Sequence, residues 1–311
     1  MDGVAQLPKN AIGRLAYIGM TTPDAAGLCQ FYERALGFRL LTAGRLSGLD
    51  AAAGGAYRVT LGLGHEVIEL LQFDRPGRFY PTAASTSDLR FQHFAIVVAD
   101  MTTAYQRLCS VGGWSPISID GPQRLPPSSG GVEAFKFRDP DGHPLELLGF
   151  PQQHMPQYWK AYSKAELFLG IDHSAISVSD SQRSIAFYQA LGLRVASRSL
   201  NNGCEQALLD GLSDPDVEVT ALDPPQPTPH LELLCYRSAM HDGGAALRPN
   251  DVATTRVVFE SGGLPDADAA GQQTLTDPDG HHIVIVNSVR NVGATPNAGL
   301  PSASVKSESP R

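Results

Sequence analysis

The residues Asp139-Pro140-Asp141-Gly142-His143 occur a second time in the chain, as Asp277-Pro278-Asp279-Gly280-His281. Asp, Pro and Gly in this order are typical of a tight turn. Each copy leads into an apolar run, Pro144 to Phe150 in the first case and His282 to Val286 in the second, which predicts a buried strand after each turn. A repeated turn and strand indicates that the chain contains two halves of similar design.

A second repeat lies upstream of each turn. Phe31-Tyr32 is followed by Ala35-Leu36-Gly37-Phe38, and Phe187-Tyr188 by Ala190-Leu191-Gly192-Leu193, at an offset of 187 − 31 = 156 residues. Apolar side chains recur at helical spacing in both segments, which predicts a helix in each. Asp24 is expected to cap the first helix and Ser179 or Asp180 the second, because an oxygen at this position accepts the free N–H groups of the first turn.

Each half therefore begins with a strand, continues into a helix and ends in further strands. We expect an α+β fold of two fused domains, at 13–150 and 170–290, each made of paired βαβββ units that form curved mixed sheets. The units of the first domain span 13–75 and 90–150, and the third unit spans about 170–237. The fourth is shortened, since Thr255 and Asp277 are 22 residues apart where His93 and Asp139 are 46 apart. Residues 151–169 are expected to be a linker or short helix, and the Ser-, Pro- and Gly-rich 291–311 a disordered tail.

The bulk composition excludes several classes of protein. The 311 residues are 42% hydrophobic and 18% charged, with a net charge of −8 and no basic cluster, so nucleic-acid binding is disfavoured. No apolar run has the length of about 20 residues that a membrane helix needs. Four scattered cysteines form no CxxC pair, and Met1 to Asn10 shows no secretory signal, so we expect a cytoplasmic protein with reduced thiols.

Five charged or titratable residues fall inside predicted apolar strands. A buried polar group needs a partner, and an unpaired buried carboxylate is especially costly, so these positions are the first place to look for a binding site. The residues are Glu69, His93, Glu146, His173 and Glu232.

The Asp-capped helix with Phe-Tyr and Leu-Gly-Phe, together with the Asp-Pro-Asp-Gly-His turn before Leu145-Glu146-Leu147, resembles the vicinal oxygen chelate superfamily. This family includes glyoxalase I, methylmalonyl-CoA epimerase, extradiol dioxygenases and the bleomycin- and fosfomycin-resistance proteins. The resemblance covers residues 13–150 and 170–287. It implies that each unit can supply one metal ligand from its first strand or one from its last.

Carried over unit by unit, the resemblance offers a pair of positions from each unit: Tyr17 and Glu69, His93 and Glu146, His173 and Glu232, and Thr254 or Thr255 with Val284. If the two units of one domain enclose a site, neither site is complete. In the glyoxalase-like arrangement, cavities form between domains. One cavity then holds His93, Glu146, His173 and Glu232, while the other holds the remaining set and is inactive. We predict this second arrangement.

Two imidazoles and two carboxylates suit one divalent ion, Fe²⁺, Mn²⁺, Co²⁺, Ni²⁺ or Zn²⁺. The resemblance then implies a metal-dependent lyase or isomerase of glyoxalase or epimerase type, acting on a small substrate with adjacent oxygens. Glu146 is the first choice for general base and Glu232 the second.

Two alternatives stay open. The first is an Fe²⁺-dependent extradiol ring-cleavage dioxygenase, and the second is a non-catalytic binding protein of the resistance type. The sequence is also compatible with either a monomer or a homodimer.

Overall fold

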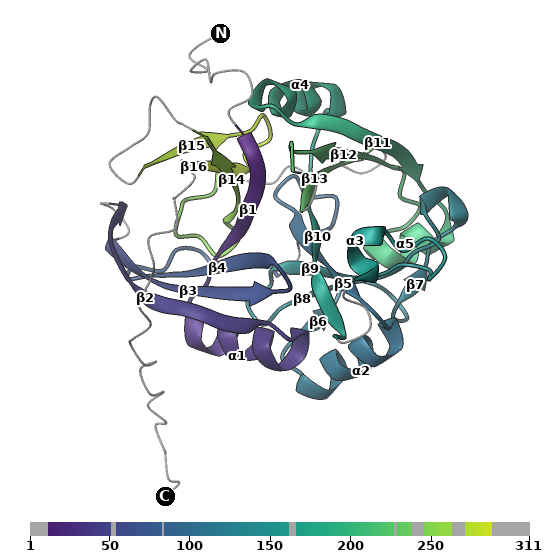
Figure 1. Cartoon of the computed structure of the whole chain (residues 1–311), viewed down its shortest axis with the longest axis horizontal. Coiled ribbons are helices and arrows are strands. Elements are labelled where there is room, and N and C mark those ends of the chain that lie inside the picture. Colours follow the sequence, from purple (N-terminus) through teal and green to yellow (C-terminus); the bar gives the residue numbers. More distant parts are fainter. Residues whose placement is uncertain are drawn as a thin grey trace, which may run out of the picture.

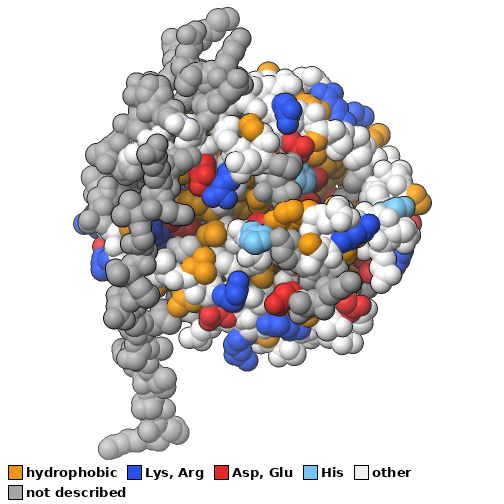
Figure 2. All heavy atoms as spheres, in the orientation of Figure 1, with side chains coloured by type: hydrophobic (Ala, Val, Ile, Leu, Met, Phe, Trp, Pro, Cys, Tyr) orange, Lys and Arg blue, Asp and Glu red, His pale blue; other side chains and the backbone are white. Residues whose placement is uncertain are grey.

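The computed structural model describes residues 12–50, 54–82, 84–161, 166–226, 229–237, 246–262 and 271–287, without the side chains of 47–50. The predicted tail 291–311 lies outside the described residues. Within them the strands form two mixed sheets, with the longer helices on the outside of the sheets (Figure 1). None of the described helices has the length and apolar character that crossing a membrane requires. On the face shown in Figure 2, acidic and basic side chains are interspersed among the described residues.

The first sheet joins the first and fourth units. Its strand order is β15-β16-β14-β1-β4-β3-β2, so the chain's first strand pairs with strands from its far end (Figure 1). The first unit contributes β1 (Ile12–Thr21), α1 (Ala25–Leu36), β2 (Arg39–Asp50), β3 (Gly54–Leu63) and β4 (Glu66–Phe73). The fourth contributes β14 (Thr255–Ser261), β15 (Gln272–Thr276) and β16 (His282–Asn287).

The second sheet joins the second and third units, in the order β11-β12-β13-β10-β5-β9-β8-β6, with β7 paired to β8. The second unit contributes β5 (Gln92–Val98), α2 (Met101–Val111), β6 (Ser115–Pro116), β7 (Gln123–Arg124), the 3-10 turn η1 (Pro127–Ser129), β8 (Glu133–Arg138) and β9 (Pro144–Gly149). The third contributes β10 (Phe168–Ser177), α4 (Ser181–Leu191), β11 (Arg194–Asn201), α5 (Cys204–Asp210), β12 (Val217–Asp223) and β13 (His230–Tyr236). Both sheets are therefore built across the two halves of the chain, as the glyoxalase-like arrangement requires.

The two repeated motifs contact each other inside each half. The Tyr32 hydroxyl donates to Asp139 Oδ2 at 3.0 Å, and the Tyr188 hydroxyl donates to Asp277 Oδ2 at 3.0 Å. The imidazole of His143 bonds the same Asp139 oxygen at 2.9 Å and, through Nε2, the Thr21 carbonyl at 2.9 Å. The motifs thus link the helix of one unit to the turn of the next, and so link one sheet to the other.

The predicted helix ends are confirmed. Asp24 accepts a hydrogen bond from Gly27 N, and Gly37 ends α1 in the left-handed conformation at φ 74°. Asp180, rather than Ser179, caps α4 through Arg183 N. The Ser179 hydroxyl instead donates to Asp279 of the second turn.

The third unit, the segment before it and the fourth unit are compared next with the sequence prediction. The third unit contains an additional helix, α5, between β11 and β12. The segment 151–169, expected to be a linker or short helix, holds the short helix α3 (Gln157–Lys160), and β10 begins at Phe168, inside this range. In the fourth unit the stretch between β14 and β15 includes residues 263–270, which lie outside the described residues, so the loss of its helix stays a prediction.

Candidate metal centre

The site lies where the two halves meet in the second sheet. Strands β5 and β10 are antiparallel neighbours, with Ala175 opposite His93 and Ala95 opposite His173. Each is flanked by a parallel strand, so that Glu146 lies beside Ala95 and Glu232 beside Ala175. Since side chains in the same row of a sheet share a face, the two alanines leave room in the middle for the longer side chains around them.

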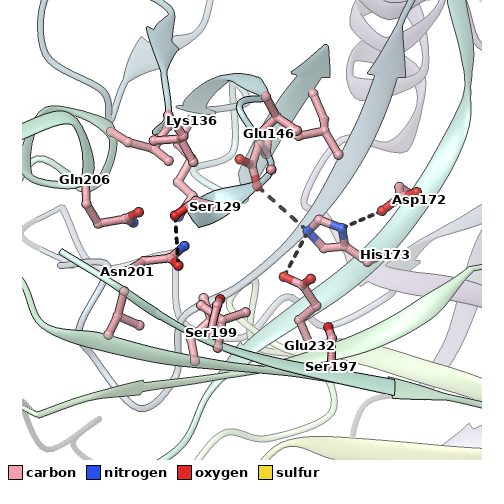
Figure 3. A pocket seen from close by; sticks show the side chains of 18 of the residues that line it. Ser129, Lys136, Glu146, Asp172, His173, Ser197, Ser199, Asn201, Gln206 and Glu232 are labelled. Atoms are coloured by element: carbon pink, nitrogen blue, oxygen red, sulfur yellow. Dashed lines mark hydrogen bonds and ion pairs between the residues drawn. The ribbon is translucent and has the colours of Figure 1, made fainter. Parts of the chain in front are cut away.

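The four predicted ligands come together in the structure. His93 Nε2 is 2.8 Å from Glu146 Oε2, and the two imidazole ring centres are 5.7 Å apart. His173 Nε2 lies 3.8 Å from Glu146 Oε2 and 3.5 Å from Glu232 Oε2 (Figure 3). Three of these residues, His93, Glu146 and His173, are buried and place one ligand atom each within 4.8 Å of one another, so that they could hold a metal ion.

The ring of His173 is oriented by its neighbour Asp172. Adjacent residues of a regular strand point to opposite faces, but β10 has an irregularity between Ile171 and His173. Asp172 Oδ2 therefore reaches His173 Nδ1 at 3.0 Å, while Oδ1 accepts from Trp159 Nε1 of α3 at 3.1 Å. A carboxylate that accepts the Nδ1 proton leaves the Nε2 lone pair facing the cavity, as in the carboxylate–histidine pairs of metal sites.

The charges around His173 favour a bound cation. Burial alone lowers the pKa of this imidazole, but the carboxylates of Glu232, Asp172 and Glu146 raise it to about 9. His173 Nε2 is buried and has no hydrogen-bond partner among the described residues. An unpartnered nitrogen that faces two carboxylates at more than hydrogen-bond distance fits a divalent metal.

The other ligands are consistent with this fit. Burial lowers the pKa of His93, which keeps the imidazole neutral, the form in which a histidine binds a metal. Burial alone would raise the pKa of Glu146. The hydrogen bond with His93 and the charge of Lys136 lower it by more, so the net shift is downward. The pKa of Glu232 is also lowered, since His173 and His230 outweigh its burial. Both glutamates are therefore ionised.

These residues line a cavity of about 470 Å³. Its walls include strand β11, whose alternate residues Ser197, Ser199 and Asn201 face inward (Figure 3). Ser129 of η1 donates to Asn201 Oδ1 at 3.1 Å, which joins the second unit to the third at the cavity wall. Such a volume suits a small molecule.

Besides Asp172, two residues of the site were not singled out from the sequence. Lys136 lines the cavity and its Nζ is 2.6 Å from Asp210 Oδ1. His230, for which the sequence suggested no role, places Nε2 3.5 Å from Glu232 Oε1. A charged residue between Phe135 and Phe137 was a usable signal for Lys136, because strand alternation puts it on the face opposite to the two aromatic rings.

The cavity predicted to be inactive is also present, in the first sheet. It has about 140 Å³ and is lined by Tyr17, Glu69, Arg256 and Val284, among others. Arg58 lies 3.7 Å from Glu69 and gives this carboxylate an ion-pair partner. Desolvation raises the pKa of Glu69 and lowers that of Arg256 to about 10. The described residues at this cavity include no group that could hold a metal ion.

The remaining histidines of the described chain lie outside the candidate metal centre. His143 and His281 are buried in the two repeated turns, where His281 Nε2 bonds the Ser177 carbonyl at 2.7 Å, so their role is structural. His65 and His154 are exposed, and His282 lines the second cavity. His241 lies outside the described residues.

Comparison with known proteins agrees with this fold. The model of the Glyoxalase/Bleomycin resistance protein/Dioxygenase superfamily matches residues 14–147 and 170–297. The chain therefore belongs to this superfamily, the vicinal oxygen chelate proteins, and contains two of its domains. No curated protein matches the sequence.

Two solved structures resemble most of the chain. Glyoxalase I from Zea mays aligns at a TM-score of 0.57 and 18% identity, over 88% of this chain and 92% of the maize chain. A candidate dioxygenase from Bacillus subtilis aligns at a TM-score of 0.53 and 11% identity, over 90% and 86%. At these identities the likeness shows a shared fold.

Proposed function

We propose that the chain is a metal-dependent enzyme of glyoxalase or epimerase type, which acts on a small substrate with two adjacent oxygen atoms. The observation that carries the proposal is the buried, unpartnered Nε2 of His173, which faces the carboxylates of Glu146 and Glu232. In this proposal His93, Glu146, His173 and Glu232 hold one divalent ion, chosen from Fe²⁺, Mn²⁺, Co²⁺, Ni²⁺ and Zn²⁺.

A bound divalent ion would act as a Lewis acid on the substrate oxygens and make the neighbouring C–H bond more acidic. Glu146 is the proposed general base. Its carboxylate is ionised, its side chain is 8% exposed, and it lies deep in the cavity next to both imidazoles. A base that is shielded from bulk water can hold the proton and return it to an adjacent carbon or oxygen of the same substrate.

Glu232 is the second candidate for the base. Its side chain is 21% exposed, and His230 lies beside its Oε1. This carboxylate is more open to exchange with water than that of Glu146. A proton taken by Glu232 would therefore be lost to solvent more readily than one taken by Glu146.

The first experiment measures metal content. Protein purified without chelators should contain one divalent ion per chain, and His93→Ala and His173→Ala should each reduce it to background. His154→Ala, which changes an exposed histidine outside the cavity, is the matched control. If His173→Ala keeps its metal, the proposal of a metal site shared between the two halves is wrong. A folded, metal-free wild-type protein would instead favour a binding protein of the resistance type.

The second experiment concerns the base. Metal-loaded protein is incubated in D₂O with a panel of small α-hydroxy ketones and 2-oxo acids, and C–H exchange is followed by NMR. Glu146→Gln should slow exchange by at least about 100-fold, the usual contribution of a general base. If Glu232→Gln is the slower variant, the two glutamates have the opposite roles.

A second function is supported by one observation. The buried group of His93, Glu146 and His173 has two imidazoles and one carboxylate, which is also the ligand set of Fe²⁺ oxygenases. Glu232, the more exposed carboxylate, would then be off the metal. Oxygen consumption by the Fe²⁺-loaded protein with catechols separates this ring-cleaving dioxygenase from the favoured isomerase or lyase.

A further inference from the structure

The two halves of the site are related by an approximate twofold axis between β5 and β10, and Lys136 breaks that symmetry. One row across the sheet contains His173, Ala95 and Glu146, and the matching row contains His93, Ala175 and Glu232. Beyond Glu146, on β8, the first row continues with Lys136. Beyond Glu232, on β12, the second row continues with Ala221. A lysine therefore stands at one end of the site and a small apolar residue at the other.

The Lys136 ammonium group is held in place by a carboxylate that is itself fixed. Its side chain is 5% exposed, and Nζ lies 2.6 Å from Asp210 Oδ1. The other oxygen of Asp210 accepts from Gln206 Nε2 at 2.7 Å and from the Tyr236 hydroxyl at 3.0 Å. Gln206 and Asp210 both belong to α5, the helix that the third unit adds to the repeated pattern. The additional helix thus brings the partner that positions Lys136.

Lys136 has capacity to bind a ligand. An ammonium group has three N–H donors, and Nζ makes one hydrogen bond among the described residues, to Asp210. Since Asp210 also bonds Gln206 and Tyr236, its charge is shared among three donors. Because Lys136 lines the cavity, its remaining donors are available to a molecule that enters it.

The ammonium group of Lys136 differs in charge and burial from most of the other charged groups that line the cavity. Its other charged lining residues include the acidic Glu146, Glu232 and Asp172. Arg198 is the other lining residue of the described chain with a permanent positive charge, and it is exposed. In Figure 3, Lys136 and Gln206 lie on the side of the cavity away from His173 and Asp172, near Ser129 and Asn201. A molecule that extends from the imidazole of His173 past Glu146 meets the buried ammonium group of Lys136.

We propose that Lys136 binds an oxyanion substituent of the substrate, so that the substrate is a small acid carrying a carboxylate or phosphate group in addition to its two adjacent oxygens. This inference rests on the proposed function, because the adjacent oxygens are placed by the metal site. It narrows the substrate class from small compounds with two adjacent oxygens to those that also carry an anionic group. Lys136 acts here as a substrate-binding residue that determines specificity.

The test compares three metal-binding probes that share one chelating group. Acetohydroxamate has adjacent oxygens alone, malonohydroxamate adds a carboxylate, and phosphonoacetohydroxamate adds a phosphonate. Their dissociation constants for the Zn²⁺-loaded protein are measured by calorimetry. Wild-type protein should bind at least one of the two acidic probes about tenfold or more tightly than acetohydroxamate, the gain expected from a buried charge-assisted hydrogen bond. The acidic probe that binds more tightly identifies carboxylate or phosphate.

Lys136→Met should abolish this preference while zinc content and the affinity for acetohydroxamate stay unchanged. Lys136→Met/Asp210→Asn removes the charge on both partners, and it tests the same preference if the single variant does not fold. Arg198→Met is the matched control and should keep the preference. Three outcomes contradict the role of Lys136 without contradicting the metal site. A variant without Lys136 still prefers an acidic probe, Arg198→Met loses the preference instead, or wild-type protein binds all three probes equally. Wild-type protein that takes up no zinc contradicts the proposed function, and this inference with it.

Discussion

His93 and His173 lie on neighbouring antiparallel strands, one from each half of the chain, with their ring centres 5.7 Å apart. Neither half contains both residues. Because each sheet is built across the halves, the strand pair β5–β10 creates a site that the separate sequence repeats do not have. The same pairing gives the first sheet a second cavity with other residues, so one duplication produced two cavities of different chemistry.

The orientation of His173 by Asp172 leads to a first prediction. Asp172→Asn should weaken metal binding by about 10- to 100-fold, the usual effect of removing the carboxylate that orients a ligating histidine. Competition of the purified protein with a chromogenic chelator measures this affinity. Asp172 is also bonded to Trp159 of α3, so circular dichroism should confirm that the variant is folded. An unchanged metal affinity would mean that the ring does not depend on this contact.

Much of the fold could be predicted from the repeated motifs, because their residues act locally. Asp24 and Gly37 begin and end a helix, and Asp139 and Gly142 make a turn, whatever the rest of the chain does. The convergence of the four predicted ligands also followed from the motifs, once the family resemblance indicated how the units combine. The strand position of each residue was therefore enough to place it.

The parts of the site that were not predicted depend on contacts that produce no periodic pattern in the sequence. Asp172 reaches His173 only because β10 is irregular at that point, and a regular strand would direct the two side chains to opposite faces. Asp210 reaches Lys136 only through α5, an element without a counterpart in the first unit. The irregularity in β10 has a counterpart in β1, between Leu15 and Tyr17, whereas α5 departs from the repeat. Neither feature shows as a periodic pattern in the sequence.

The buried pair His143 and Asp139 predicts a pH dependence of stability. Burial alone would lower the pKa of His143, but the Asp139 carboxylate raises it by more, to a net value of about 9. The pKa of an unfolded histidine is about 6.5. Since the folded pKa is the higher one, the stabilisation is fully present below about pH 6.5 and is lost as the pH rises through 9, by an amount on the order of 3 kcal/mol. Urea unfolding at pH 6, 8 and 10 measures it.

For this experiment His143→Asn is compared with wild type and with the exposed control His154→Asn. The difference in unfolding free energy between wild type and His143→Asn should be largest at pH 6 and shrink towards pH 10. A difference that is constant over this range would show that His143 contributes through packing and neutral hydrogen bonds alone.

Glu69 and Glu232 offer a matched pair that tests which cavity binds metal. Both occupy the same place in their strands, Glu69 beside Gly19 and Glu232 beside Ala175. Glu232→Gln should weaken metal binding by at least about tenfold, since it removes a charged ligand. Glu69→Gln should leave it unchanged at one ion per chain, because Glu69 faces Arg58 and Arg256. Metal analysis after equilibrium dialysis measures both effects. Two ions per wild-type chain would contradict the prediction that only the cavity of the second sheet binds metal.

The sharing of both sheets predicts that neither half folds into a functional protein alone. A fragment ending at residue 161 would lose β10 beside β5 and β14 beside β1, which leaves two interior strands as unpaired edges. Exposed strand edges of this kind associate or aggregate, so each fragment expressed alone should be insoluble or oligomeric and bind no metal. Co-expression of 1–161 with 166–311 should restore both pairings and one ion per chain pair, because the break falls after α3 and before β10. Size-exclusion chromatography with metal analysis makes the comparison. A monomeric first half that binds metal by itself would place the site within one domain, and would overturn the arrangement on which the proposed function depends.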